Sequence, residues 1–158
     1  MTKNSNYRII SVGGSIIIPP EGFNIIFLKK FRELILKRVA LGEKFILVVG
    51  GGSTCRKYQA AAKEVVKVLD KDLDWLGIYA THFNAKFVGL LFNGWSYKKL
   101  IENPTKKLIT DKPIYAYTAT EFPPKSLPVS QFEMHAAEDF GIFKFDIQFF
   151  TEILTNSY

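Results

Sequence analysis

Apolar residues follow two different periods along the first half of the chain, and each period predicts a different element. Residues 45–49 are consecutively apolar and rich in β-branched side chains, which is typical of a parallel strand buried on both faces. Residues 8–12 form a similar short run. A helical spacing of three and four predicts an amphipathic helix over residues 24–39, with Asn24 as its N-cap and Gly42 just beyond its C-terminus. The apolar residues at that spacing are Phe27, Phe31, Leu34, Ile35 and Val39.

A second helical pattern begins after the residues that follow the buried strand. We expect this helix to run from Ser53 to about Leu69, with Val65, Val66 and Leu69 on its apolar side. The charged residues 70–72 predict a polar break. Residues 73–92 are again mostly apolar at helical spacing, so they predict a further helix.

Three polar residues interrupt the pattern of residues 73–92. Asp74 fits either a helix N-cap or a ligand contact. Thr81 and Asn84 lie three positions apart and therefore share one face of the helix. Each of these two is either a ligand contact or a polar side chain whose hydrogen bonds are satisfied in the core.

Glycine-rich loops end both predicted strands. Gly13-Gly14-Ser15 follows residues 8–12, and Gly50-Gly51-Gly52 follows residues 45–49. The order strand, loop, helix, strand, loop, helix predicts parallel strands joined by a right-handed crossover. Both loops then lie at the carboxyl edge of the sheet, where ligands bind in open α/β folds.

Backbone without side chains suits a phosphate, because its N–H groups can approach the anion closely. The helix that begins at Ser53 adds unpaired donors and a partial positive charge, and Arg56 could add a charged hydrogen bond. A tight turn without a ligand is the alternative. Neither loop matches G-x-G-x-x-G or G-x-x-x-x-G-K-[ST], so the common dinucleotide and P-loop sites are not predicted.

Composition narrows the class of protein. The chain has 158 residues, of which 47% are hydrophobic and 23% charged, as in a folded single domain. No apolar run approaches the roughly 20 residues of a membrane span, and the polar start is unlike a secretory signal. The one cysteine, Cys55, suits a reducing cytoplasm and is expected to pack as a small apolar residue. The net charge of +6 is spread over helix faces, so no nucleic-acid partner is expected.

Three segments together resemble the amino acid kinase superfamily, and most closely its archaeal-type uridylate (UMP) kinases. They are residues 11–15, residues 48–56 and residues 74–85, and their order and spacing match the family across residues 8–92. The resemblance implies a three-layer α/β/α sandwich with a mainly parallel sheet. It also implies transfer of the ATP γ-phosphate to UMP, giving UDP in pyrimidine nucleotide synthesis, with Mg²⁺ as cofactor. Positioning and charge neutralisation carry such a reaction.

Carried over residue by residue, the resemblance implies two groups of binding residues. The ATP and phosphate group comprises Gly13, Gly14, Ser15, Gly52 and Arg56. The UMP group comprises Gly51, Asp74, Thr81 and Asn84, with Asp74 on the sugar. The resemblance assigns no catalytic side chain and no metal ligand. It suggests a homo-oligomer, a hexamer built from dimers, with the helix of residues 24–39 near the interface.

The sequence departs from the family in three places. Ser11 stands where many members have a lysine, and His82 stands within a common Thr-Arg-x-Asn pattern. Residues 112–117 match the family's next strand, but residues 118–130 lack the glycines of the loop expected over UMP. We therefore expect one partial domain over residues 1–158 that is family-like over about 8–117. Residues 118–158 are expected to be a divergent tail, and the half that would hold adenine is expected to be absent.

These departures leave three hypotheses for the function. The chain is a UMP kinase that needs its missing half from another chain, or it is a catalytically impaired nucleotide-binding or regulatory fragment of the same family. The third hypothesis is a structural relic whose glycine loops persist without a ligand. Phosphoryl transfer needs its charge-neutralising groups placed together, so autonomous turnover is not expected.

Overall fold

The computed structural model describes residues 7–99 and 111–118 of the chain. Its sheet is parallel, in the order β1 (Tyr7–Val12), β2 (Lys44–Val49) and β3 (Ile114–Tyr117). Val12 is paired with Val49, so β1 and β2 end level with each other. The two predicted strands, their parallel direction and the strand expected within residues 112–117 are confirmed.

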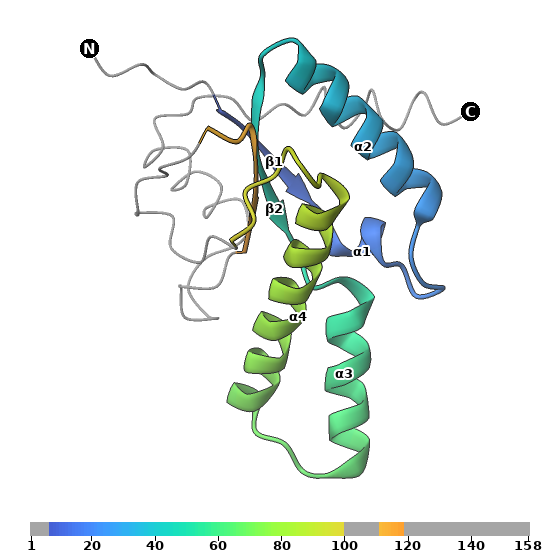
Figure 1. Cartoon of the computed structure of the whole chain (residues 1–158). Helices are drawn as coiled ribbons and strands as arrows, with labels where there is room; N and C mark the ends of the chain where they lie inside the picture. The colour runs from blue at the N-terminus through green and yellow to red at the C-terminus, as the bar shows by residue number, and fades with distance from the viewer. Residues whose placement is uncertain (1–6, 100–110, 119–158) are drawn as a thin grey trace.

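Two long helices lie on the same face of the sheet (Figure 1). They are α2 (Ile25–Ala40) and α4 (Asp70–Leu91). The Phe31 and Phe92 rings meet edge to face at 5.9 Å, and the Arg32 Nε donates to the Leu91 carbonyl at 2.6 Å. The helical layer is therefore one packed unit.

Two other helices follow the glycine loops directly. A single turn, α1 (Gly14–Ile17), follows β1, and α3 (Gly52–Val65) follows β2. Figure 1 shows α3 running beside the first part of α4, so that the two form a hairpin that extends away from the sheet. None of the helices within the described residues is long and apolar enough to cross a membrane.

The core lies between the sheet and the helical layer. Alternate residues of the strands face α2 and α4, and they are buried, as the strand period requires. These residues are Ile10, Val12, Phe45, Leu47, Val49 and Ile114. The opposite face of the sheet is also buried, with Ile9, Ile46, Val48 and Tyr115 among its residues. The α/β class and the parallel sheet are confirmed, while the elements that would form the expected third layer lie outside the described residues.

The predicted ends of α2 are confirmed. The Asn24 side chain accepts a hydrogen bond from the Phe27 N–H at 3.1 Å, as an N-cap does. Gly42 follows the C-cap residue Leu41 with φ +87°, a conformation that glycine adopts without strain. The expected turn over residues 19–22 also forms, closed by the Gly22 N–H on the Pro19 carbonyl at 3.1 Å.

Removal of this cap gives a first prediction. Asn24→Ala leaves an N–H group of the first turn without its side-chain acceptor, so we expect the free energy of unfolding to fall by about 1 kcal/mol. Urea denaturation followed by circular dichroism measures this loss. Asn24→Asp keeps the acceptor and serves as the control; an equal loss in both variants would contradict the capping role.

The boundary between the second and third predicted helices is wrong. The structure ends α3 at Val65, where the next residue becomes extended, and α4 already begins at Asp70. Val65, Val66 and Leu69 are exposed rather than packed. Residues 70–72 form the first turn of α4, where acidic side chains favour the positive end of the helix dipole. Asp74 therefore lies inside the helix, and the N-cap position belongs to Leu69.

Candidate functional site

The two glycine loops touch each other at the carboxyl edge of the sheet. A Cβ atom on Gly14 would lie 2.3 Å from the Gly52 nitrogen and 2.5 Å from the Gly50 oxygen. A Cβ atom on Gly52 would lie 2.4 Å from the Gly14 oxygen, and Gly52 has φ +62°. Only residues without a side chain permit this approach, so the two loops form one continuous backbone surface.

Several N–H groups of this surface make no backbone hydrogen bond with the described part of the chain, although Gly14 itself is buried. Within the described residues, the N–H groups of Gly13, Gly14, Gly51 and Gly52 donate to no backbone carbonyl. The last two belong to the N-terminus of the 14-residue helix α3, whose dipole places partial positive charge there. Several N–H donors around a helix N-terminus form a site suited to a phosphate or another anion.

Ser15 and Arg56 bring side-chain donors to the same edge. Ser15 lies in α1 and Arg56 lies one turn into α3, and both residues are exposed. The Arg56 Nη2 donates to the Ser15 Oγ at 3.5 Å, a long hydrogen bond. An anion held by the glycine N–H groups would therefore have a guanidinium group and a hydroxyl group beside it.

Ser53 fixes the position of the loops, a role that the sequence analysis missed. Its side chain is buried, and its Oγ donates to the Pro19 carbonyl at 3.0 Å. The Ser53 N–H donates to the Ile18 carbonyl at 3.2 Å. These two bonds join the start of α3 to the segment after α1. The one available signal was a hydroxyl residue directly after three glycines.

Asn84 joins α4 to the second glycine loop. Its side chain is fully buried, and its Nδ2 donates to the carbonyls of Gly50 and Gly51, both at 2.9 Å. Its Oδ1 is buried as well and has no hydrogen-bond partner in the described part of the chain. Asn84 thus orders the loop and keeps one acceptor unused beside it, while its contact with a ligand stays a prediction.

Thr81 and Asp74 lie at different positions along the axis of α4. The Thr81 Oγ1 donates to the Ile78 carbonyl at 2.7 Å, and its Cγ2 lies 3.5 Å from where a Cβ on Gly51 would stand. Asp74 is half-buried and lies seven residues earlier, about 10 Å along the helix axis. The structure therefore brings Thr81 to the loops and leaves Asp74 apart from them. His82 is half-buried.

Cys55 fills the space between α3 and α4. Its Cβ lies 2.9 Å from where a Cβ on Gly51 would stand, and its Sγ lies 3.3 Å from the corresponding position on Gly77. Burial raises the pKa of the Cys55 thiol, and the nearby Arg56 charge offsets part of that effect. A raised pKa keeps the thiol protonated and unreactive, which agrees with the packing role expected for this residue.

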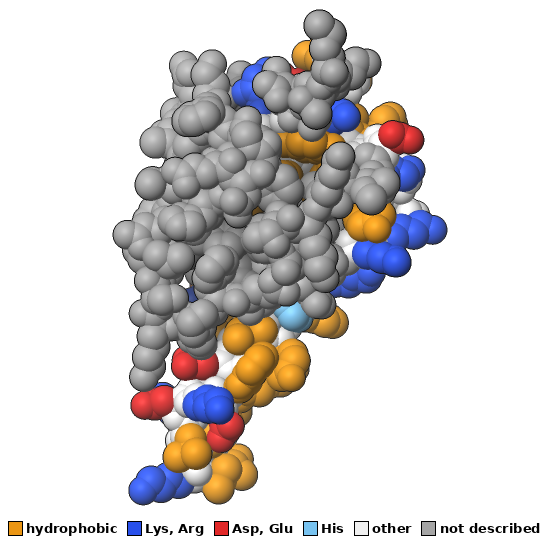
Figure 2. Space-filling view, turned by 90° about the vertical axis from the view of Figure 1, so that its left-hand side faces the viewer, with side chains coloured by type: hydrophobic (Ala, Val, Ile, Leu, Met, Phe, Trp, Pro, Cys, Tyr) orange, Lys and Arg blue, Asp and Glu red, His pale blue; other side chains and the backbone are white. Residues whose placement is uncertain are grey.

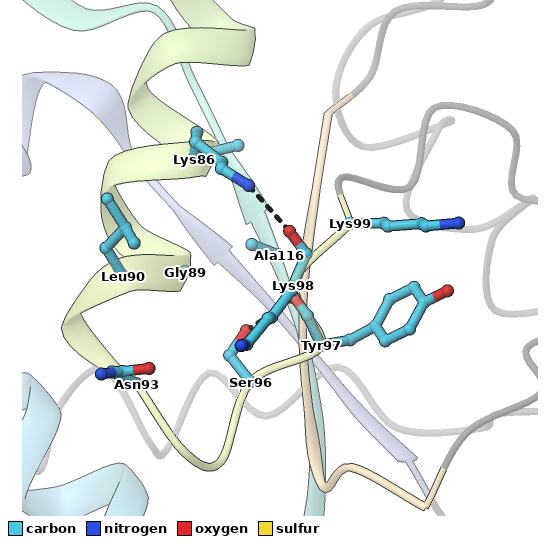
Figure 3. A pocket seen from close by; sticks show the side chains of 10 residues that line it. Lys86, Gly89, Leu90, Asn93, Ser96, Tyr97, Lys98, Lys99 and Ala116 are labelled. Carbon is cyan, nitrogen blue, oxygen red and sulfur yellow. Dashed lines mark hydrogen bonds between the residues drawn. The ribbon is translucent and has the colours of Figure 1, made fainter.

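A cavity of about 310 Å³ lies on the other side of α4, next to β3 (Figure 3). Lys86, Gly89 and Leu90 line it from α4, and Ala116 lines it from β3. The Lys86 Nζ donates to the Lys98 carbonyl at 2.7 Å. None of the nine candidate binding residues contributes to this cavity, so it is separate from the glycine edge.

Comparison with known proteins places the chain in a family. The sequence model described as "Amino acid kinase family" matches residues 6–131. The uridylate kinase of Methanococcus aeolicus is 30% identical over 95 residues, which are 60% of this chain and 41% of that protein. The uridylate kinase of Sulfurisphaera tokodaii is 39% identical over 72 residues, or 46% of this chain and 31% of that protein.

A solved structure has the same fold. The uridylate kinase from Archaeoglobus fulgidus superposes with a TM-score of 0.68 at 22% sequence identity, over 87% of this chain and 59% of the other. The matched region spans less than half the length of the curated relatives. The family model covers most of the sequence, and this protein therefore belongs to the amino acid kinase family.

Proposed function

We propose that the glycine edge binds nucleotide phosphates and that the chain serves phosphoryl transfer from ATP to UMP, giving UDP. One observation carries this proposal: the two glycine loops meet in direct backbone contact at the carboxyl ends of adjacent parallel strands. Donor and acceptor phosphates must lie next to each other for transfer, and one continuous surface of N–H groups can hold both.

The donor side of the proposed site is built from the first loop. Gly13, Gly14 and Ser15 would face the ATP phosphates, because they precede or begin α1 at the open edge. Gly52 and Arg56 would neutralise the charge that develops between donor and acceptor, through an N–H group at the start of α3 and through the guanidinium.

The acceptor side is built from the second loop and from α4. Gly51 would approach the UMP phosphate, with Thr81 and Asn84 shaping the space beside it. The unused buried Asn84 Oδ1 is available to a donor on a ligand. Asp74 would accept a hydrogen bond from the UMP ribose. It lies about 10 Å from Thr81 along α4, which leaves room for the ligand to extend from its phosphate, beside Thr81, to its sugar.

Mg²⁺ is the cofactor that the family implies for ATP. Within residues 7–99 and 111–118, no three His, Cys, Asp or Glu side chains lie close enough together to hold a metal ion. We therefore assign no step and no ligand to the metal. What the described residues supply is N–H groups, one guanidinium and one hydroxyl.

A second candidate is a nucleotide-binding module of the same family without turnover. The sequence of residues 118–130 favours it, because it contains no glycine where the family places a glycine-rich loop over UMP. Both candidates need the same phosphate edge, so binding and turnover must be measured separately.

Two measurements test the proposal. UDP formation from ATP and UMP, followed in a coupled assay at high protein concentration, tests turnover. A thermal shift with UMP alone tests binding, because a ligand that binds only the folded state raises the unfolding temperature. A UMP-dependent shift without UDP formation selects the binding module. The absence of both would overturn the assignment of nucleotide phosphates to this edge.

Arg56 gives a specific prediction for this site. Arg56→Ala removes a charged hydrogen bond to phosphate, so we expect the affinity for UMP or ATP to fall about 10- to 100-fold. Isothermal titration of each nucleotide measures this change. Lys63→Ala is the control, since it removes one positive charge from the exposed far end of the same helix. An equal loss in both variants would show that only overall charge matters.

A further inference from the structure

The chain leaves helix α4 through an exposed turn that contains the dipeptide Asn93-Gly94. Asn93 follows the C-cap residue Phe92, and both residues of the dipeptide are exposed. Asn93 is the only asparagine in the sequence that is followed by glycine. The backbone nitrogen after an asparagine can attack the side-chain amide of that asparagine. A glycine at the attacking position leaves the approach unhindered, because it has no Cβ.

The structure leaves both reacting groups of this dipeptide accessible. In the described part of the chain, the Gly94 N–H group donates to no backbone carbonyl. Gly94 has φ +89°, and a Cβ atom placed on it would have no atom within 4 Å. Figure 3 shows the Asn93 amide beside the cavity next to β3, without a hydrogen bond to the other labelled residues. Ring closure requires rotation about the Asn93 Cα–C bond, and the open space around Gly94 leaves room for it.

Hydrogen bonds on either side hold the turn in place. The Trp95 N–H donates to the Phe92 carbonyl at 2.9 Å, and the Lys112 Nζ donates to the Gly94 carbonyl at 2.6 Å. Neither bond uses the Gly94 nitrogen or the Asn93 amide. The fold therefore fixes the position of the turn and leaves the two groups that react unoccupied.

We propose that Asn93 is a site of spontaneous deamidation in the folded protein. The Gly94 nitrogen forms a bond to the Asn93 Cγ, the bond between Cγ and Nδ2 breaks, and the proton of the Gly94 N–H leaves with the amide nitrogen as ammonia. Water then opens the succinimide ring at either of its two carbonyls, which gives aspartate or isoaspartate at position 93. The reaction involves no oxidant, reductant or enzyme.

The new carboxylate would lie among lysines. Asn93 lines the cavity of about 310 Å³ together with Lys86, Lys98 and Lys99. Either product therefore lowers the positive charge around this cavity. An isoaspartate also adds a methylene group to the backbone that leads from α4 to the bridge between Ser96 and Ile114.

The far end of α4 is separate from this change. Figure 2 shows hydrophobic side chains gathered on the α3–α4 hairpin, and the hairpin contains the first turns of α4, whereas Asn93 follows its last turn. The proposal concerns a covalent change at the end of α4 and stands independently of the nucleotide proposal.

Peptide mapping by mass spectrometry tests the proposal on the folded full chain, incubated for days at physiological temperature and at neutral and mildly alkaline pH. We expect deamidation at Asn93 to be at least about tenfold faster than at Asn24 or Asn84, which corresponds to a barrier lower by about 1.4 kcal/mol. Asn24 precedes the β-branched Ile25, and Asn84 is fully buried with its Nδ2 bonded to two carbonyls. The rate at Asn93 is expected to rise with pH, because the attacking nitrogen must lose its proton.

The same chain unfolded in guanidinium chloride separates the effect of the fold from that of the sequence. We expect the rates at Asn93 in the folded and unfolded chains to agree within about tenfold, whereas Asn84 is expected to be protected by folding more strongly than that. Asn93→Gln is the matched variant, since its longer side chain would have to close a larger ring, and circular dichroism confirms that it is folded.

Four outcomes would each overturn the proposal. They are a rate at Asn93 no higher than at Asn24, protection of Asn93 by folding beyond about tenfold, an aspartate product without isoaspartate, and an unchanged isoaspartate signal in Asn93→Gln. The expected result is isoaspartate and aspartate together at position 93 of the folded chain, and neither product in the Asn93→Gln variant.

Discussion

Replacing Gly14 by alanine is expected to lower the free energy of unfolding by about 3 kcal/mol. The new methyl group would meet the Gly52 nitrogen at 2.3 Å and the Gly50 oxygen at 2.5 Å. Both are backbone atoms, which cannot rotate away as a side chain can. The second loop must therefore move, and the end of β2 and the start of α3 move with it. Urea denaturation followed by circular dichroism measures the loss.

Gly13→Ala is the matched control for this prediction. A Cβ on Gly13 meets only the Ile16 side chain, at 3.6 Å, and Gly13 has a φ of −55° that alanine adopts freely. We expect a change within about 0.5 kcal/mol. If Gly14→Ala were as stable as Gly13→Ala, the direct contact between the two loops would be wrong.

Asn84→Asp is expected to lower the free energy of unfolding by about 4 kcal/mol at neutral pH, because it buries a carboxylate without a partner. The wild-type Nδ2 donates to two carbonyl oxygens, whereas a carboxylate in its place would face them with like charge. Protonation restores one donor. The deficit relative to wild type is therefore expected to shrink as the pH falls toward about 4, where the carboxyl group of the unfolded chain also becomes protonated.

The same substitution on the surface controls for the added charge. Asn93 is exposed just beyond the end of α4, so Asn93→Asp is expected to cost less than about 1 kcal/mol through its effect on the helix dipole. Denaturation curves at several pH values compare the two variants. A small, pH-independent loss for Asn84→Asp would show that Asn84 does not hold the loop.

The sequence predicts the sheet well because the strands are continuous apolar runs that end in glycine. Residues 8–12 and 45–49 each lie within one residue of the observed bounds of β1 and β2. Parallel direction and a shared loop edge follow from the order of the elements. The same reasoning finds the cap at Asn24, since that residue type and its position before an apolar period act locally.

The boundary between α3 and α4 could not be predicted from the local sequence pattern. Val65, Val66 and Leu69 continue the apolar period, which favoured a longer helix, yet all three are exposed. The chain turns there because α4 must run back along α3, where the Gln59 Nε2 donates to the Leu73 carbonyl at 2.8 Å. Such a contact between distant residues leaves no local signal.

Residue types identified the candidate site but not its internal connections. Three glycines and an arginine at a sheet edge suggest a phosphate site from residue types alone, without coordinates. The roles of Ser53 and Asn84 depend on which carbonyls their side chains reach, and those carbonyls belong to Pro19, Gly50 and Gly51. Each of these bonds joins residues about 34 positions apart, so it depends on how the chain packs and cannot be predicted from local sequence.

The contact between Gly14 and Gly52 also constrains how the gene can change. A residue inserted into either loop would have to displace the other loop from the position it occupies, so the lengths of the two loops are coupled. Natural variation in this region is therefore expected as paired replacements at constant length, while insertions and deletions collect elsewhere, such as the exposed turn between α3 and α4.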